Sequence, residues 1–328
     1  MKRDQRIFFP SLGVPNDEGT WQIDVHAWCF RSRARGLVIP LVRKALGFEH
    51  ATLTPSQDQT FTERARWMFV DNKRGRSISV TMEGRVHRLG KTRPNGHLRG
   101  RIAVNLPADR VPACLVTPAS LEIHFLTAEG LSVISDIDDT IRVSHVADRA
   151  ALLRTTFVEP FEAVQGMADI YAAWARNGAQ FHYVSATPWQ LYVPIAAFLD
   201  AHNFPKGTFH LKDFRWHDRT FFNLFASADR YKSRQIEPLL KRLPKRHFVM
   251  VGDSGQRDPE VFGDLARRYR QQVRWIFVRD ISGARGSALP RSQRARYRDA
   301  FAGVDRRIWR VFTDAGMLPT TLTEERTP

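Results

Sequence analysis

The first third of the chain alternates apolar and polar residues in short segments. Such alternation places every second side chain on one face, which is typical of half-buried β-strands. The segments are residues 23–30, 65–70, 77–82, 100–106 and 119–125. Turn-forming sequences separate several of them, for example Asp71–Gly75 and Pro94–Gly96. Short strands joined by such turns predict an all-β sandwich, with residues 38–47 as a short inserted helix.

From residue 131 the pattern changes to compact apolar runs that alternate with segments of helical spacing. The expected strands are residues 131–135, 181–185, 209–211, 247–251 and 273–278. The expected helices are residues 161–176, 189–202, 231–242 and 260–270, followed by an Arg-rich helix at 291–314. Strands alternating with helices predict a Rossmann-like parallel sheet whose faces are covered. Functional residues of such sheets lie beyond the carboxyl ends of the strands.

The length of the chain fits this division, because 328 residues leave room for two domains. We expect a β-sandwich-like domain at residues 1–128 and an α/β domain at residues 129–283. Residues 284–328 are expected to form the Arg-rich helix and a flexible polar tail.

Composition excludes several classes of protein. No apolar run approaches the roughly 20 residues that span a bilayer. The residues after Met1 include no sustained apolar stretch of the kind found in secretory signals. Only two cysteines are present, Cys29 and Cys114, far apart and without metal-binding spacing, which excludes a disulfide scaffold. We therefore expect a cytoplasmic protein that is at most peripheral at a membrane.

The charge of the chain is strongly positive. Fifty Lys and Arg residues against 34 Asp and Glu residues give a formal net charge of +16. The excess is spread along the sequence, at +8 for residues 1–130, +4 for 131–283 and +4 for 284–328. Such a surface attracts polyanions: nucleic acid, anionic lipid or a phosphorylated substrate. A diffuse excess is equally what an Arg-rich composition gives, so charge alone does not choose a partner.

The residues that could carry chemistry follow the expected strands. Asp136, Asp138 and Asp139 come directly after the strand at 131–135. Carboxylates so close together repel one another, so they either form a solvated loop that caps the next helix or hold a cation. Hard oxygen ligands favour Mg²⁺.

Three further signals occur later in the chain, and each is ordinary by itself. Ser185 and Thr187 lie at a strand-to-helix junction, where hydroxyl side chains often cap the helix. Lys232 lies near the start of a helix, where the helix dipole is already positive, which suggests a nearby anion. Asp253 and Asp258 follow the strand at 247–251.

Together these signals resemble the four motifs of the haloacid dehalogenase (HAD) superfamily. The motifs read Asp-x-Asp-x-Thr, then Ser, then Lys, then Gly-Asp-x5-Asp in sequence order. The flanking sequences SDIDDTI at 135–141, YVSATPWQLY at 183–192 and VGDSGQRDPE at 251–260 resemble a narrower group. This group is the catalytic domain of the actin-patch-associated phosphatidate phosphatase family, in a bacterial-type member. The resemblance implies a HAD-like phosphatase domain and a Mg²⁺-dependent phosphoric monoester hydrolase.

The resemblance also implies catalytic roles. Asp136 would attack phosphorus and form an aspartyl-phosphate. Asp138 would protonate the leaving alkoxide and then take a proton from the hydrolytic water, which requires a pKa that lets it start as the acid. Thr140 would brace the loop. Ser185 and Lys232 would hold the non-bridging phosphoryl oxygens.

Metal and substrate contacts are implied in the same way. The Mg²⁺ ligands would be Asp136, the backbone carbonyl of Asp138, and Asp253. Asp258 would support them by orienting Lys232 or a metal-bound water. Thr187 would add to the substrate contacts made by Ser185 and Lys232. Apart from the resemblance, Arg257 lies close to a strand end, where it either contacts phosphate or forms a structural ion pair.

The substrate is left open among several classes. Residues 142–160, with Arg142, His145, Arg149 and Arg154, and the basic, aromatic residues 203–230 are the segments able to cover the site. A basic, aromatic rim suits a lipid headgroup at an anionic membrane, and it equally suits nucleic-acid ends. The family resemblance implies phosphatidate, and a soluble phosphorylated metabolite is a further alternative. A different class is a membrane- or partner-binding protein in which catalysis is secondary.

Overall fold

The protein is described by a computed structural model over residues 3–16, 19–32, 35–105, 116–213, 228–283 and 291–322. Its contacts divide the chain into two compact units, residues 1–128 and 129–328. Each unit contains its own sheets and its own buried apolar residues.

The first unit is rich in β-structure. One sheet has the order β3-β2-β1-β8, with β6 also paired to β2, and a second sheet has the order β5-β4-β7. The strands of the first sheet are β1 Gln5–Pro15, β2 Trp21–Arg31, β3 Asp71–Asn72, β6 His97–Val104 and β8 Ile123–Phe125. Those of the second are β4 Ser77–Met82, β5 Arg85–Lys91 and β7 Val116–Thr117. Alternate residues of both sheets meet in one apolar core, which includes Ile23, Val25, Val80 and Ile102.

Two helices follow β2 in the first unit. α1 (Arg35–Ala45) agrees with the predicted helix at 38–47, but α2 (Pro55–Met68) covers most of 65–70, which alternation predicts as a strand. That prediction is wrong because the helix starts upstream, at a capping box in which Thr54 and Gln57 exchange hydrogen bonds of 3.3 and 3.0 Å. Its buried residues then recur at helical spacing, at Phe61, Ala65 and Met68.

The second unit is a mixed α/β fold around a six-stranded parallel sheet. The sheet order is β11-β10-β9-β12-β13-β14. The strands are β9 Leu131–Ser135, β10 Gln180–Pro188, β11 Gly207–Lys212, β12 His247–Asp253, β13 Val273–Arg279 and β14 Trp309–Phe312. The first five agree with the predicted strands to within a few residues. All five residues of β9 are buried, as expected for a central strand covered on both faces.

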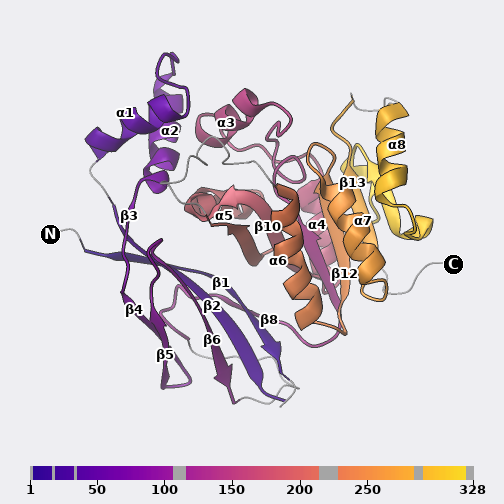
Figure 1. The fold of residues 1–328 in the computed structure, drawn as a ribbon, viewed down its shortest axis with the longest axis horizontal. Helices are drawn as coiled ribbons and strands as arrows, with labels where there is room; N and C mark the ends of the chain where they lie inside the picture. The colour runs from indigo at the N-terminus through magenta and orange to yellow at the C-terminus, as the bar shows by residue number, and fades with distance from the viewer. Residues whose placement is uncertain are drawn as a thin grey trace. The chain divides into compact units, whose positions relative to one another are not determined.

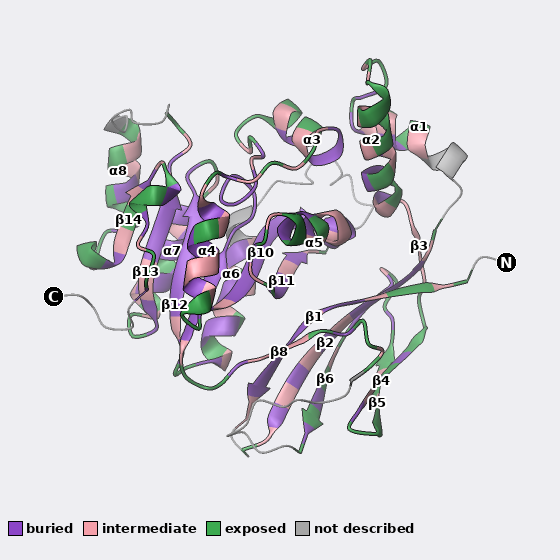
Figure 2. Ribbon diagram, turned by 180° about the vertical axis from the view of Figure 1, so that it is seen from behind, coloured by how far each residue is buried: buried purple, intermediate pink, exposed green. Residues whose placement is uncertain are grey.

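Helices cover both faces of this sheet. α6 and α7 lie in front of it in Figure 1, and α4 and α5 lie in front in the reversed view of Figure 2. The helices are α3 Arg149–Phe157, α4 Met167–Arg176, α5 Tyr192–Ala201, α6 Ala228–Arg242 and α7 Asp258–Arg268, with a 3-10 turn, η1, at Trp189–Leu191. The chain changes face between β11 and β12, so β9 lies at the point where the strand order reverses. Crevices form at the carboxyl ends of strands at such a point.

The carboxyl-terminal part of the described chain adds a strand to the sheet. The predicted single helix at 291–314 is wrong: α8 ends at Ala300 (Arg291–Ala300), and β14 pairs in parallel with β13. Three residues beyond α8, Gly303 has a φ of 73°, in the left-handed region, so the chain does not resume a helix there. Two 3-10 turns, η3 (Arg306–Ile308) and η4 (Ala315–Met317), flank β14.

None of the helices in the described part of the chain is long and apolar enough to cross a membrane.

We expect Gly263→Ala to destabilise the second unit, although alanine in place of glycine normally favours a helix. A Cβ at residue 263, within α7, would lie 2.0 Å from the backbone oxygen of Ala300 in α8. The expected loss is about 1–3 kcal/mol of unfolding free energy, measured by urea unfolding. Gly283→Ala is the matched control, since nothing lies within 4 Å of its Cβ position. Equal stability of the two variants would show that α7 and α8 do not pack this closely.

Candidate active site

The sequence-predicted residues gather at the carboxyl edge of the parallel sheet. Asp136 follows β9, Asp253 ends β12, and Asp258 begins α7. The backbone N–H of Asp136 donates to the carbonyl of Val251 at 2.9 Å, which joins the two strand ends. Lys232 reaches the same place from α6. The parallel topology therefore brings together residues that lie more than 100 positions apart in the sequence.

Three carboxylates and one ammonium group form the centre of this site. Oxygens of Asp136, Asp253 and Asp258 all lie within 4.8 Å of one another. Lys232 Nζ lies 3.1 Å from Asp136 Oδ1 and 2.5 Å from Asp258 Oδ1. All four side chains are buried, with relative exposures of 3% or less. The Asp258 side chain packs directly against Gly252, since a Cβ at residue 252 would lie 2.2 Å from Asp258 Oδ2. A glycine at this position therefore leaves room for the Asp258 carboxylate.

The electrostatics of this centre follow from burial and like charge. Burial raises the pKa of Asp136 well above its usual range, Lys232 opposes the shift, and Asp258 and Asp253 add to it. Burial and Asp258 raise the pKa of Asp253 to about 7. Burial alone would lower the pKa of Lys232, but Asp136 and Asp258 raise it, so its ammonium group stays charged. One positive charge thus faces three carboxylates, and the centre favours additional positive charge.

A divalent cation fits the donor atoms of this centre. Asp253 Oδ1 accepts hydrogen bonds from the N–H groups of Gly255 and Gln256, at 2.6 and 3.2 Å. Asp253 Oδ2 is buried and has no hydrogen-bond partner within the described structure. A buried carboxylate oxygen without a partner is costly, and carboxylate oxygens are preferred Mg²⁺ ligands. Asp136 and Asp253, the two carboxylates expected to bind a metal, lie together in this centre, and Asp258 contacts Lys232.

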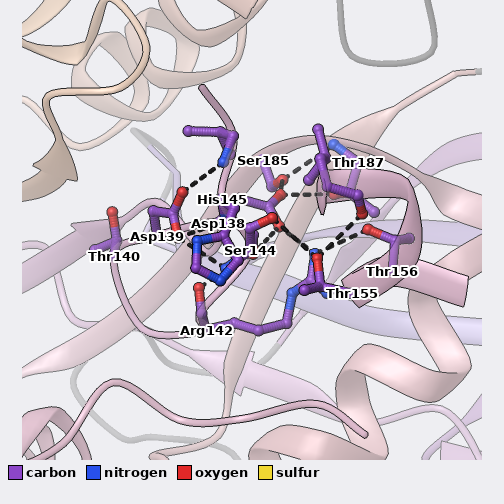
Figure 3. A network of polar contacts seen from close by, with 12 residues as sticks. Asp138, Asp139, Thr140, Arg142, Ser144, His145, Thr155, Thr156, Ser185 and Thr187 are labelled. Atoms are coloured by element: carbon purple, nitrogen blue, oxygen red, sulfur yellow. Dashed lines mark hydrogen bonds and ion pairs between the residues drawn. The ribbon is translucent and has the colours of Figure 1, made fainter. Parts of the chain in front are cut away.

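Asp138 lies in a different environment from Asp136, within a network of donors drawn in Figure 3. Arg142 and Ser144 donate to Oδ1, the latter at 2.9 Å. Ser185 and Thr187 donate to Oδ2 at 3.0 and 2.8 Å. Burial opposes ionisation, but the Arg142 charge and these hydrogen bonds lower the pKa of Asp138. Four donors thus stabilise the carboxylate of Asp138, whereas the acid role expected of it requires the protonated form.

The loop that follows Asp138 is held by Asp139, which the sequence did not single out as a structural residue. Asp139 has a φ of 54°, in the left-handed region that aspartate tolerates. Its carboxylate accepts three backbone N–H groups at 2.6–2.9 Å, from Ser144, His145 and Val146. Arg279 donates to its carbonyl at 2.6 Å. These four hydrogen bonds define the backbone conformation of the loop.

The other predicted residues divide between buried and exposed positions. Thr140 Oγ1 donates to Asp136 Oδ2 at a long 3.4 Å, the position expected of a loop brace. Ser185 and Thr187 are buried and their hydroxyls contact Asp138. Arg257 differs, because its side chain is exposed at the residue before α7 and it is not part of the buried cluster.

Arg142 lies elsewhere than the sequence suggests. It is predicted on a rim that covers the site, but it is 1% exposed and forms an ion pair with Asp138. Its guanidinium also lies over the ring of Phe161, 4.5 Å from the centroid. The prediction is wrong because burial of Asp138 requires a cation beside it. A signal was present in the sequence, since Arg142 follows Asp138 by four residues.

The rim proposed from residues 203–230 is largely outside the described part of the chain, which stops at 213 and resumes at 228. Of its basic residues, Lys212 ends β11, and burial lowers its pKa. Arg149 is exposed on α3, and Arg154 pairs with Glu159 at 2.6 Å.

Comparison with known proteins confirms the family resemblance of this stretch. Residues 131–280 match the model of the family described as "Phosphatidate phosphatase APP1, catalytic domain". The phosphatidate phosphatase APP1 of Saccharomyces cerevisiae is 30% identical over 167 residues, 49% of this chain and 28% of that protein. An uncharacterized protein of Schizosaccharomyces pombe is 27% identical over 164 residues, 49% of this chain and 27% of that protein. The chain thus matches less than a third of the length of these relatives.

A likeness to a solved structure adds nothing to this. The crystal structure of a flavohemoglobin from Malassezia yamatoensis aligns at 10% identity over 94% of this chain and 60% of that chain. The TM-score of 0.16 is too low for an argument about the fold.

We expect Lys232→Met to destabilise the metal-free protein by about 3–5 kcal/mol at pH 7.5, because it leaves buried carboxylates without a counter-charge. Urea unfolding in buffer without divalent cations measures the effect. Lys241→Met, on the same helix with a side chain that is 65% exposed, is the control and should change stability by less than about 0.5 kcal/mol. Similar losses in both variants would contradict the arrangement described for Lys232.

Proposed function

We propose that the second unit is a HAD-like, Mg²⁺-dependent phosphatidate phosphatase, which converts phosphatidate to diacylglycerol and phosphate. The observation that carries the proposal is the buried centre of Asp136, Asp253 and Asp258 around Lys232, with one Asp253 oxygen unpaired. Membership of residues 131–280 in a phosphatidate phosphatase catalytic family supports the substrate class. The first unit is proposed to be a β-sandwich, which by itself implies no function.

Asp136 is the proposed nucleophile. Its carboxylate lies beside the ammonium of Lys232 and is braced by Thr140, so its position is fixed before substrate binds. Attack by a carboxylate oxygen forms an oxygen–phosphorus bond while the bond from phosphorus to the lipid oxygen breaks, which leaves an aspartyl-phosphate. Bound Mg²⁺ would be held by Asp136, Asp253 and the Asp138 carbonyl and would supply charge neutralisation between the carboxylate and the phosphate. Asp258 keeps Lys232 directed at the nucleophile through their 2.5 Å contact.

Asp138 is the proposed general acid and base. Protonated, it would give its proton to the departing lipid oxygen; ionised, it would take a proton from the water that hydrolyses the aspartyl-phosphate. The four donors around it favour the ionised form and therefore suit the second step. The first step requires loosening of these hydrogen bonds when the substrate binds. Ser185 and Thr187, which now donate to Asp138, are free to turn their hydroxyls to the phosphoryl oxygens at that moment.

The surroundings suit an anionic substrate. Lys232 and Ser185 are placed to hold non-bridging phosphoryl oxygens, where transition-state charge accumulates. Arg257 is exposed nearby in sequence and is proposed to contact the outer part of the substrate. The net charge of +16 would draw the chain to anionic lipid and support a peripheral association with the membrane.

Asp136→Asn should lower the turnover number with phosphatidate by roughly 10³-fold or more, because the amide cannot act as the nucleophile. Phosphate release from mixed vesicles of phosphatidate and phosphatidylcholine measures this. Asp264→Asn, the same chemical change at a half-exposed position on α7, should leave turnover within about two-fold. Retained activity of Asp136→Asn with intact folding would refute the assignment.

Removal of divalent cations should abolish turnover, and added Mg²⁺ should restore it, since the buried carboxylates cannot approach a phosphate dianion without added positive charge. The measurement is phosphate release after treatment with a chelator, followed by Mg²⁺ titration. The same assay with a 3′-phosphorylated oligonucleotide and with small phosphate esters distinguishes the substrate classes. Full activity in the chelator would contradict the metal requirement, and preference for the oligonucleotide would contradict the lipid substrate.

A further inference from the structure

The turn that follows β12 carries two of the acidic residues of the site. Residues 254–257 connect Asp253 to Asp258, and the backbone N–H of Asp253 donates to Asp258 Oδ2 at 3.2 Å. The orientation of the Asp253 carboxylate depends on this turn, because Oδ1 is held by the N–H groups of Gly255 and Gln256. If the turn shifted, the unpaired Oδ2 would move with it.

Arg296 of α8 forms hydrogen bonds with the backbone of this turn and with the first turn of α7. Its Nη1 donates to the carbonyl of Ser254 at 2.5 Å, and its Nη2 donates to the carbonyl of Gln256. Its Nε and Nη2 donate to the two carboxylate oxygens of Glu260, at 2.8 and 3.0 Å. One planar guanidinium thus binds both sides of the turn and the first residues of α7. Such a fork-shaped set of contacts cannot be reproduced by a lysine.

The helix that carries Arg296 is itself anchored. Tyr297 donates to the carboxylate of Asp280, which follows β13. Arg267 of α7 donates to the carbonyl of Ala300 at 2.9 Å, and Gly263 allows close approach of the same carbonyl. Ser254 Oγ accepts the N–H of Ile281 at 3.0 Å, so the turn is also tied to the segment after β13. These contacts hold α8, and with it the backbone of Arg296, against α7 and the segment after β13.

We propose that Arg296 is a positioning residue for the cation site. It holds the turn at 254–257 so that Asp253 Oδ2 stays directed at the centre formed with Asp136. Arg296 belongs to α8, which lies outside residues 131–280, the stretch that matches the family model. The carboxyl-terminal segment therefore contributes to the structure of the cation site. The inference rests on the proposed function in one respect, the binding of a divalent cation by Asp253.

A second reading of Arg296 is purely electrostatic, since a cation near Asp253 would also favour its ionised form. The two readings differ in what a lysine does at this position. Lysine keeps the charge but is a point donor, so it preserves an electrostatic effect and loses the fork that binds two carbonyls and a carboxylate. Arg296→Lys and Arg296→Gln therefore separate positioning from charge.

The test measures cation affinity directly. Binding of Mn²⁺ to the metal-free full chain is followed by the loss of the free-ion EPR signal, and Mg²⁺ binding by competition. Because substitution of residues that orient metal ligands typically costs about 10- to 100-fold in affinity, we expect that range for both Arg296→Gln and Arg296→Lys. Hydrogen exchange at residues 253–260 should be faster in both variants. Phosphate release at saturating Mg²⁺ should recover most of the wild-type turnover.

The control is Arg298→Gln, on the same helix, whose side chain is 80% exposed. It removes the same charge and should leave cation affinity within about two-fold. Wild-type affinity in Arg296→Lys would overturn the positioning role in favour of charge. Wild-type affinity and unchanged exchange in Arg296→Gln would overturn any role. Absence of cation binding by the wild-type chain would instead refute the proposed metal dependence, and the inference with it.

Discussion

The second unit depends on the charge balance around Lys232. Asp136, Asp253 and Asp258 come from three different elements of the chain, and each is buried where an isolated carboxylate would be expensive. One ammonium group from α6 contacts two of them and keeps its charge because of them. Three carboxylates lie around one ammonium group, so the centre has fewer positive than negative groups. This excess of carboxylates is a physical reason to expect a bound cation, and it is independent of any resemblance to other proteins.

Two aspartates separated by one residue illustrate how the tertiary environment assigns different chemistry to the same side chain. Asp136 faces other carboxylates, and its pKa rises. Asp138 faces Arg142 and three hydroxyl groups, and its pKa falls. Pairs of titratable groups whose surroundings shift their pKa values in opposite directions are common in active sites. In this structure the ionised Asp138 matches the base step of the proposed reaction, and the acid step depends on rearrangement of its donors.

Support for the site extends beyond the residues that touch it. Asp139 organises the loop after β9 by accepting three backbone N–H groups, and Arg279 fixes its carbonyl. On the other side of the centre, α8 approaches α7 closely at Gly263 and places Arg296 against the turn after β12. These contacts explain why the carboxyl-terminal segment belongs to the same compact unit as the parallel sheet. The first unit has its own apolar core.

The parallel α/β pattern and the order of the motif residues could be predicted from the sequence, because buried strands are short continuous apolar runs and polar residues follow their carboxyl ends. The sequence misread 65–70 as a strand because a capping box upstream sets the helix, and alternation over six residues is compatible with both structures. It also misplaced Arg142, and it gave no reason to connect Arg296 with Asp253. Arg296 and the turn after Asp253 lie in separate segments that only the folded chain brings together. Only the tertiary structure shows which carboxylates share a counter-charge and therefore in which direction each pKa moves. The physical reason is that burial and distance depend on the folded chain and not on sequence order.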